Sequence, residues 1–285
     1  MVEKIWAQVA SALGSPVSKA SPVSGGDIND AYRVKLADGR EVFVKTHDAA
    51  PQGLFQAEAR GLQWLADARA IALPKVLAVS NDDAVPFLVL ELLEPGPRPR
   101  DFDERLGREL ATLHRVGAAD FGLDHDNFIG SLPQPNTVEH DWPSFYRQQR
   151  LVPQVRRAAR HLGNALQQKF EQLYARLPDF VGAAEPPARL HGDLWGGNLH
   201  ATASGAPCLI DPAVYGGHRE IDLAMMQLFG GFAERVFDAY DEAFPLQPDW
   251  RERVPLYQLY PLLVHVNLFG GGYVGSVQRA LSRYV

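Results

Sequence analysis

The sequence has few of the features that mark secreted or membrane proteins. Its 285 residues include one cysteine, Cys208, so an intramolecular disulfide is excluded, and the apolar stretch around it is typical of an inert core thiol. No apolar run approaches the roughly eighteen residues of a membrane span, and the amino terminus lacks a signal-peptide core. We therefore expect a cytoplasmic protein that has no membrane partner.

Positive charge is also scarce. The formal net charge is −6, and the most basic stretch, Arg156–Arg160, has the pattern of a solvated helix face. A nucleic-acid partner is therefore not expected. The chain contains no G-x-x-x-x-G-K-[ST] segment, which disfavours a P-loop fold. A content of 46% hydrophobic and 22% charged residues is that of a soluble globular protein, and the length allows two lobes.

Apolar periodicity divides the chain into a strand-rich part and a helix-rich part. Residues 2–13 and 54–69 have helical spacing. Strands are expected on both sides of residues 24–29, at 41–45 after an Asp38-Gly39 hairpin turn, at 76–79 and at 86–93. Helices are expected at 102–116, 142–160, 163–177, 220–243 and 250–283, and short strands near 188–190, 199–201 and 207–210. This pattern predicts an α+β bilobal fold, with a β-rich N-terminal lobe at 1–94 and an α-rich C-terminal lobe at 95–285.

The segment His191-Gly-Asp-Leu-Trp-Gly-Gly-Asn198 carries the strongest chemical signal. Asp193 precedes Asn198 by five positions, and Asp211 follows thirteen positions later. Protein kinases use the same order in H-R-D-L-x-x-x-N and D-F-G. Phosphoryl transfer needs a carboxylate where the nucleophile's proton goes and oxygen ligands for Mg²⁺. We predict that Asp193 is the catalytic base and that Asn198 and Asp211 are metal ligands.

An ATP-binding set is predicted in the first lobe. Lys45 ends the strand Val-Phe-Val-Lys, and Glu58 lies thirteen residues further on in the next helix, where kinases keep the glutamate that pairs with this lysine. Gly25 and Gly26 lie between two strands, where backbone N–H groups can approach phosphate oxygens. Two adjacent glycines also suit a simple turn.

The end of the last strand of this lobe is a second nucleotide-binding candidate. The backbone groups of Glu91-Leu92-Leu93 precede a Pro-Gly turn, and we expect Glu91 and Leu93 to clamp adenine. His191 is expected to brace the catalytic loop, and a buried Asp222, which needs donors, is expected to support the backbone of that loop.

Several stretches together resemble the fructosamine kinase (ketosamine-3-kinase) family, within the branch that also contains aminoglycoside and choline kinases. They are Asp126-Asn-Phe-Ile-Gly130, Leu190–Asn198 with Asp211-Pro-Ala213, Tyr215–Met225 with Leu228–Phe232, Asn267–Tyr273, Trp142-x-x-Phe145 and Arg150-Leu151. The resemblance implies that the α+β bilobal fold is protein-kinase-like, of the aminoglycoside phosphotransferase type. It also implies an enzyme that uses ATP and Mg²⁺ to phosphorylate the 3-hydroxyl of free or protein-bound fructosamines, ribulosamines or erythrulosamines. The sugar phosphate then eliminates, so the amine is deglycated.

The same resemblance suggests where the substrate binds. Trp195 can offer its indole face to a sugar, or it can be a core tryptophan behind the loop. Asp126, Asn127, His218 and the Phe269–Gly272 turn are further pocket candidates with structural alternatives. Some relatives carry a cysteine in the glycine-rich segment that links two chains. This chain has none there, so we expect a monomer or a weak homodimer.

Two alternatives stay open at this stage. A choline, homoserine or aminoglycoside kinase could share the fold, although an aminoglycoside calls for acidic residues near the carboxyl terminus, and residues 277–283 are apolar and basic. A non-catalytic nucleotide-binding module is the second alternative. The presence of Lys45, Glu58, Asp193, Asn198 and Asp211 disfavours it.

Overall fold

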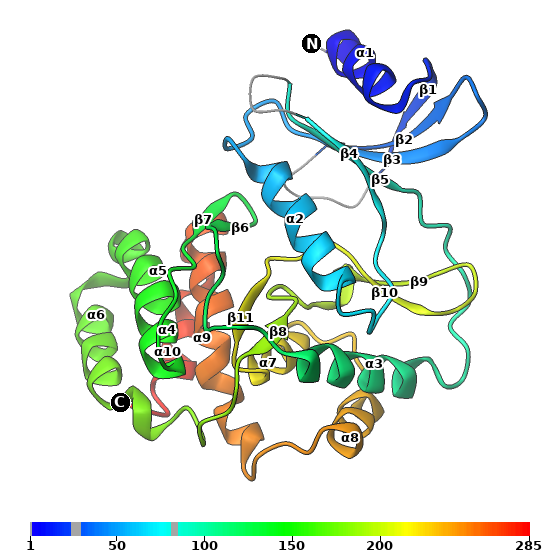
Figure 1. Cartoon of the computed structure of the whole chain (residues 1–285). Helices are drawn as coiled ribbons and strands as arrows, with labels where there is room; N and C mark the ends of the chain where they lie inside the picture. Colours follow the sequence, from blue (N-terminus) through cyan, green and yellow to red (C-terminus); the bar gives the residue numbers. More distant parts are fainter. Residues whose placement is uncertain (1, 24–29, 81–84) are drawn as a thin grey trace. The chain divides into compact units, whose positions relative to one another are not determined.

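A computed structural model describes residues 2–23, 30–80 and 85–285, so the predicted phosphate-binding pair Gly25 and Gly26 lies outside the described residues. The chain forms two compact units (Figure 1). The first contains Met1–Phe102 and His200–Pro212, and the second contains Asp103–Leu199 and Ala213–Val285. The sequence predicted a single boundary between the two lobes, after residue 94. The hairpin at 200–212 belongs to the first unit because Gly96 N–H donates to Ala201 O and Ala72 pairs with Cys208.

The first unit is built on a five-stranded antiparallel sheet with strand order β1-β2-β3-β5-β4. The strands are β1 (Val17–Pro22), β2 (Asp30–Leu36), β3 (Glu41–Thr46), β4 (Val76–Val79) and β5 (Phe87–Glu91), and the helices are α1 (Val2–Leu13) and α2 (Leu54–Ala66). The predicted hairpin turn between β2 and β3 is present. Gly39 has φ 91°, which glycine adopts readily, and Leu36 N–H donates to Arg40 O.

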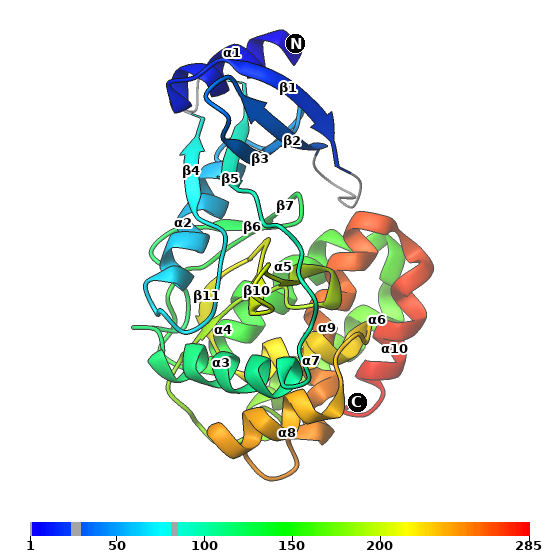
Figure 2. The same cartoon turned by 90° about the vertical axis from the view of Figure 1, so that its right-hand side faces the viewer.

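The alternation of side chains along β3 places one helix on each face of this sheet (Figure 2). Val42 and Val44 are buried with Ile5 and Val9 of α1 in one apolar cluster. Lys45 points to the opposite face, where it meets Glu58 of α2. The strand therefore buries its valines on one side and turns its lysine toward a carboxylate on the other.

The returning hairpin completes the first unit. Its strands are β9 (Leu199–Ala201) and β10 (Pro207–Leu209). Cys208 is fully buried in β10, and burial raises the pKa of its thiol to about 12. The reactive thiolate is therefore suppressed, as expected of a core cysteine.

The second unit is mainly helical. Its helices are α3 (Phe102–Val116), α4 (Trp142–Phe145), the π-helix η1 (Tyr146–Leu151), α5 (Val152–Arg157), α6 (Ala159–Arg176), η2 (Leu177–Asp179), η3 (Gly196–Asn198), α7 (Glu220–Leu228), α8 (Glu234–Ala243), α9 (Trp250–Phe269), η4 (Gly271–Tyr273) and α10 (Val274–Leu281). Two short antiparallel pairs join them, β6 (Asn127–Ile129) with β7 (Leu132–Gln134) and β8 (Ala188–Leu190) with β11 (Tyr215–Gly217).

Helix α9 is the centre of this unit, since α7 and α10 both pack against it and nine of its 20 residues are buried. Two predicted long helices are wrong in detail because glycines interrupt them. The 220–243 segment breaks at Gly230 and Gly231, which have φ 71° and 94°, and the 250–283 segment breaks at Gly270, which has φ 89°. These left-handed conformations end a helix and suit glycine. Strands β6, β7 and β11 were not predicted.

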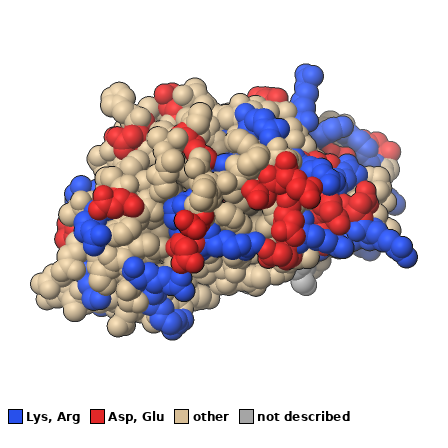
Figure 3. Space-filling model, turned by 90° about the horizontal axis from the view of Figure 1, so that it is seen from below, with Lys and Arg blue, Asp and Glu red and all other residues tan. Residues whose placement is uncertain are grey.

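The surface carries mixed charges. On the face drawn in Figure 3, Lys and Arg lie interleaved with Asp and Glu. Among the surface ion pairs are Arg235 with Asp103 at 2.8 Å and Arg108 with Glu242 at 3.6 Å. Within residues 2–23, 30–80 and 85–285, no helix combines the length and the apolar character that crossing a membrane requires.

Candidate functional site

The first unit contains a buried ionic triad formed by residues far apart in sequence. Lys45 Nζ lies 2.8 Å from Glu58 Oε1 and 2.5 Å from Asp211 Oδ1. The side chains of Lys45 and Glu58 are only 7% and 12% exposed, whereas Asp211 is 40% exposed. The strand β3, the helix α2 and the segment after β10 thus converge on one ammonium group, which is the pairing that the sequence predicted for Lys45 and Glu58.

The charges of the triad stabilise one another. Burial acts to lower the pKa of Lys45, but the carboxylates of Glu58 and Asp211 outweigh it and raise that pKa above its ordinary value. Burial also raises the pKa of Glu58, and the lysine opposes that shift. Lys45 therefore stays protonated at neutral pH and can serve as a fixed cation.

Asp211 differs from its partners in backbone as well as exposure. Its φ is 55°, in the left-handed region that residues other than glycine rarely adopt. Such conformations concentrate at functional sites, where the surroundings hold them. Its half-exposed carboxylate is a hard oxygen donor of the kind that Mg²⁺ takes. Among the described residues, no group of three or more His, Cys, Asp or Glu side chains could hold a metal ion.

The second unit contains the loop between β8 and β9. Trp195 N–H donates to Asp193 O, and Asn198 N–H donates to Trp195 O at 2.9 Å, which closes the single turn η3. Asn198 Nδ2 donates to Asp193 O at 2.8 Å and lies 3.4 Å from Asp193 Oδ2. The structure therefore brings the predicted base and one predicted metal ligand into direct contact.

A buried carboxylate lies beneath this loop. Asp222 is fully buried and accepts hydrogen bonds from the backbone N–H groups of His191 at 2.8 Å and Gly192 at 2.9 Å, while His114 Nε2 lies 3.1 Å away. Burial alone would raise the pKa of Asp222, but these donors lower it below its ordinary value. His191 is buried as well, and its Nδ1 accepts from Asp193 N–H at 3.3 Å. Both residues act on the backbone of the loop.

Gly192 is required by the shape of the loop. Its φ is 83°, and a Cβ there would lie 2.0 Å from Ala213 O. The backbone of the loop thus touches the segment that follows Asp211, and Ala213 N–H donates to His191 O at 2.9 Å. Any side chain at residue 192 would push these two segments apart.

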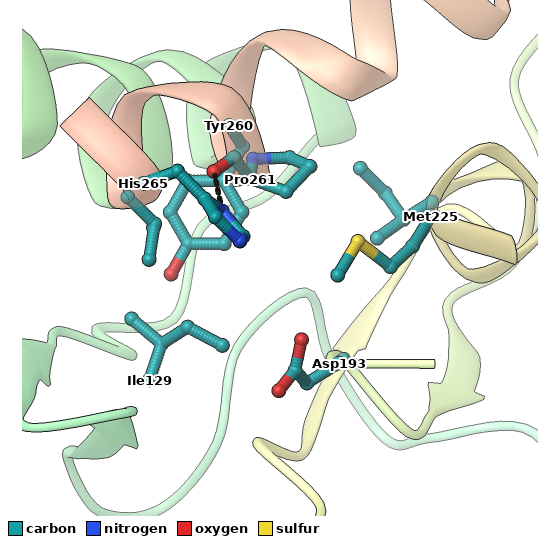
Figure 4. Close-up of a pocket in the computed structure, with 9 residues that line it drawn as sticks. Ile129, Asp193, Met225, Tyr260, Pro261 and His265 are labelled. Atoms are coloured by element: carbon teal, nitrogen blue, oxygen red, sulfur yellow. Dashed lines mark hydrogen bonds between the residues drawn. The ribbon is translucent and has the colours of Figure 1, made fainter. Parts of the chain in front are cut away.

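Asp193 faces a hollow in the second unit (Figure 4). Apolar and aromatic side chains surround the carboxylate, among them Ile129, Met225 and Tyr260. His265 also lines the hollow, and burial lowers the pKa of its ring. Its Nδ1 lies 2.7 Å from Pro261 O, the contact drawn dashed in Figure 4.

Sequence reasoning missed Met225, Tyr260 and His265, although the resemblance covered the stretch that ends at Met225. The helical spacing of α9 could have placed His265 beside Pro261, but not opposite Asp193. That juxtaposition depends on how α9 packs in the folded unit.

Trp195 is exposed rather than part of the core. It is 41% exposed, and its ring covers Gly197, where an added Cβ would lie 2.3 Å from the indole. The alternative of a core tryptophan behind the loop is therefore wrong. Phe229 and Phe269 are exposed as well, and each ring lies beside that of His265, at 4.8 and 5.4 Å between centroids.

Two predicted pocket residues do not face the hollow. Asn127 is 5% exposed, and its Nδ2 donates to Val214 O while its Oδ1 accepts from Gln134 and Asn136. His218 is 2% exposed and stacks on Tyr257, and burial lowers its pKa to about 4. Their direct role in substrate binding is corrected to an internal, structural one.

The remaining candidates keep accessible groups. Asp126 is at the surface, where its Oδ1 accepts from Asn136 N–H at 2.8 Å and braces the β6–β7 hairpin. Glu91 N–H already donates to Lys75 O, so the proposed adenine clamp narrows to the Glu91 carbonyl and the Leu93 N–H.

Comparisons with known proteins agree with this geometry. The profile of the fructosamine kinase family matches residues 1–285. A "probable ketoamine kinase" of Enterococcus faecium is 39% identical over 93% of this chain and 95% of its own length. The chloroplastic protein-ribulosamine 3-kinase of Oryza sativa subsp. japonica is 36% identical over 94% of this chain and 79% of its own length.

Solved structures extend the comparison to the fold. A crystal structure from Thermobifida fusca, assigned as a fructosamine-3-kinase, superposes with a TM-score of 0.90 at 41% identity and covers 100% of this chain and 99% of its own. The choline kinase LicA of Streptococcus pneumoniae shares the fold at a TM-score of 0.64 and 18% identity, with coverage of 99% and 98%. The predicted α+β, kinase-like fold is confirmed, and ketosamine kinase is favoured over the choline and aminoglycoside alternatives. The chain belongs to the fructosamine kinase family of phosphotransferases, as the sequence motifs predicted.

Proposed function

We propose that this enzyme transfers the γ-phosphoryl group of Mg·ATP to the 3-hydroxyl of ketosamines. The observation that supports it most is the loop of the second unit, where the Asp193 carboxylate faces an apolar, aromatic hollow in a chain of this family. Apolar walls suit the C–H faces of a sugar, and one carboxylate suits one acceptor hydroxyl. The ribulosamine kinase among the relatives supports the same class of acceptor.

Bound Mg·ATP supplies the phosphoryl group and a metal ion that neutralises phosphate charge. Lys45 is the fixed cation that binds the phosphate oxygens of ATP, and its ion pair with Glu58 orients it. Asp211 supplies a carboxylate oxygen and Asn198 an amide oxygen as metal ligands. The Glu91 carbonyl and the Leu93 N–H bind the adenine edge.

Asp193 handles the acceptor. Its carboxylate receives the proton of the 3-hydroxyl as that oxygen bonds to phosphorus and the bond from phosphorus to the ADP oxygen breaks. The Asn198 amide holds the Asp193 backbone, and Asp222 holds the backbone immediately before it, so the carboxylate is fixed in place. Trp195 and Asp126 flank the acceptor from the exposed side.

The product explains the biological use. A phosphate at the 3-position is a better leaving group than hydroxide, so the sugar eliminates and frees the amine. We propose that free and protein-bound ketosamines are both substrates, which makes the enzyme a cytoplasmic deglycation and protein-repair catalyst. Residues 1–94 serve mainly the nucleotide and residues 95–285 mainly the acceptor, and the chain acts as a monomer or a weak homodimer.

The test is a substrate panel. Purified enzyme with Mg·ATP is incubated with fructosamine, ribulosamine and erythrulosamine adducts of lysine, and with choline and an aminoglycoside. ADP release is followed, and the product is examined by ³¹P NMR. We expect ADP release and a new phosphomonoester signal with at least one ketosamine. Turnover confined to choline or the aminoglycoside, or nucleotide binding without turnover on any acceptor, would contradict the proposal.

A further inference from the structure

Arg150 is a buried cation that the proposed mechanism does not use. It is 0% exposed and lies on the π-helix η1. A π-helix is rare, and its wide turn appears here as the bond from Val152 N–H to Arg147 O, five residues back. This turn directs Tyr146, Arg150 and Leu151 inward together, since all three are fully buried.

No carboxylate accompanies this guanidinium among the residues that the structure describes. Arg150 Nη1 donates to Pro135 O at 2.6 Å and Nη2 donates to Asn136 Oδ1 at 2.7 Å. Its planar face lies over the Tyr215 ring at 3.7 Å from the centroid, and the Phe145 centroid is 4.6 Å away. Burying a charge without a counter-ion costs free energy. Here the hydrogen bonds to neutral oxygens and the cation–π contacts with the two rings offset that cost.

A proline makes a further acceptor available to this arginine. In an α-helix, the N–H of residue 153 would donate to Gln149 O, but Pro153 has no N–H. Arg150 Nη1 donates to Gln149 O at 3.0 Å instead. The π-turn and the proline thus create a site that fits the guanidinium of Arg150. In this site, the guanidinium donates to the Gln149 carbonyl that the missing proline N–H leaves without its helical donor.

From Arg150, a chain of buried amides leads to the wall of the acceptor hollow. Asn136, which accepts from Arg150, donates to Asn127 Oδ1 at 2.9 Å. Gln134 donates to the same Asn127 oxygen and also to Ala213 O, at 2.8 and 3.1 Å. The Tyr260 hydroxyl then donates to Gln134 Oε1 at 2.5 Å. The end of this chain is a ring that lines the hollow beside Asp193 (Figure 4).

A second path leads from Arg150 to the loop itself. Tyr215, on which the guanidinium stacks, lies 3.3 Å from the position that a Cβ on Gly192 would occupy. The Tyr260 ring is the third aromatic neighbour, at 5.5 Å from the guanidinium carbon. Of the two tyrosines that flank Arg150, Tyr215 therefore packs against the loop at Gly192, and Tyr260 lines the hollow from α9.

We propose that Arg150 is a positioning residue of the acceptor pocket: its fork and its stack fix Tyr260 and the loop at Gly192 in the geometry that binds the ketosamine. The proposal rests on the proposed ketosamine kinase function. The planar set of N–H donors at residue 150, rather than the positive charge, is what the pocket requires. A lysine keeps the charge but lacks these donors, so it should not replace the arginine. The nucleotide-binding triad shares none of these contacts.

The first test replaces Arg150→Lys and Arg150→Met and measures both Michaelis constants. We expect the KM for a ketosamine to rise about tenfold or more in both variants, while the KM for ATP stays within about twofold of wild type. An Arg150→Lys enzyme that is folded and has a wild-type ketosamine KM would overturn the proposal. If the lysine variant restores binding where the methionine variant does not, charge rather than geometry is the requirement, and the proposal is again wrong.

A second pair of variants covers the case in which Arg150 variants do not fold. Tyr260→Phe removes only the hydroxyl at the end of the amide chain, and Tyr257→Phe is its matched control. Tyr257 lies on the same helix, is fully buried and does not line the hollow. Its hydroxyl donates to Val181 O at 2.7 Å and accepts from Trp142 Nε1 at 3.2 Å. Thermal melts are recorded beside the kinetics of both variants.

The melting temperature should fall in both variants, and at least as far in Tyr257→Phe, which removes two hydrogen bonds. Only Tyr260→Phe should raise the ketosamine KM, by about fivefold, the usual effect of one lost hydrogen bond. Equal ketosamine KM values in the two variants would show that the chain is merely structural. Because wild-type activity is measured in the same assay, a failure of the ketosamine kinase function itself would be seen separately.

Discussion

The two units fix their functional groups by different physical means. In the first, Lys45 is held by opposite charges, Glu58 and Asp211, within 2.8 Å. In the second, Asp193 is held through its backbone, by Asn198 and by the bonds that Asp222 accepts from His191 and Gly192. Opposite charges thus hold Lys45, the cation proposed to bind phosphates. Hydrogen bonds to the backbone instead hold Asp193, the carboxylate proposed to accept one proton.

This difference predicts how each region fails. Removing Lys45 from the ionic triad leaves the buried Glu58 carboxylate uncompensated, so nucleotide binding and stability should change together. Removing the Asp193 carboxylate leaves the loop intact, because its supporting bonds use backbone atoms. Four substitutions sharpen this contrast.

Asp193→Asn should give the largest effect. The substitution keeps the size of the side chain and removes the proton acceptor, so turnover should fall by about 10²–10⁴-fold, the usual range for a lost general base. ATP affinity should remain near wild type. Steady-state kinetics with a ketosamine and calorimetric ATP titration measure the two quantities. Near-normal turnover would remove Asp193 from the role of base.

Lys45→Met should act on the nucleotide. Losing a fixed cation beside the phosphates should lower kcat/KM for ATP by about 10²-fold, comparable with the loss of one preorganised donor. Without the lysine, the carboxylates of Glu58 and Asp211 repel each other, and this should also destabilise the fold. The expected cost is about 3–5 kcal/mol, as for a broken buried ion pair. Glu58→Gln is the control, since it leaves Lys45 with Asp211 and should cost less. Unchanged ATP kinetics in Lys45→Met would contradict the assignment of the triad.

Trp195→Ala should affect the acceptor alone. Because the indole is 41% exposed, the melting temperature should change little, whereas a buried tryptophan would cost about 3–5 kcal/mol. The ketosamine KM should rise about tenfold with the ATP KM unchanged, as expected for lost uniform binding. A wild-type ketosamine KM would show that the exposed ring is not a sugar platform.

His218→Phe should change the pH dependence of stability, beside a pH-independent loss of the hydrogen bond that Glu220 N–H donates to His218 Nδ1. Burial lowers the pKa of His218 to about 4 in the fold, against about 6.5 in the unfolded chain. Between these values the unfolded state binds the extra proton, so this residue destabilises the wild type as pH falls from about 6.5 to about 4, by up to about 1.4 kcal/mol per pH unit. The variant keeps the ring stack and should lose this slope. Denaturant titrations at several pH values give the comparison, and identical slopes would contradict a neutral buried His218.

The sequence predicted the elements that local pattern controls. Helices 2–13 and 102–116 have the predicted bounds, because one face of each is apolar at the helical period. Strand 76–79 also has the predicted bounds, because it is a short unbroken apolar run. The order of Lys45, Glu58, Asp193, Asn198 and Asp211 indicated a kinase because phosphoryl transfer constrains residue type and spacing. The comparisons confirm that family.

The parts that could not be predicted depend on distant contacts. Tyr260 donates a hydrogen bond to Gln134, which lies 126 positions away in the sequence. The packing of His218 against aromatic rings also depends on distant residues, Trp142 and Tyr257. Asn127 was a pocket candidate through the family resemblance, with a structural role as the alternative, and its three buried hydrogen-bond partners favour the structural role. The π-turn at Arg150 has no clear periodic signal, since Pro153 indicates only that an ordinary helix bond is missing.

The division of labour between the two regions is tested most directly by measuring ATP binding and turnover side by side in Asp193→Asn and Lys45→Met. Isothermal titration with Mg·ATP and ADP release with one ketosamine are measured on the same preparations. The account predicts that Asp193→Asn binds ATP within about twofold of wild type while turning over at least about 10²-fold more slowly, and that Lys45→Met loses ATP affinity. Wild-type ATP affinity in Lys45→Met, or loss of ATP affinity in Asp193→Asn, would contradict it.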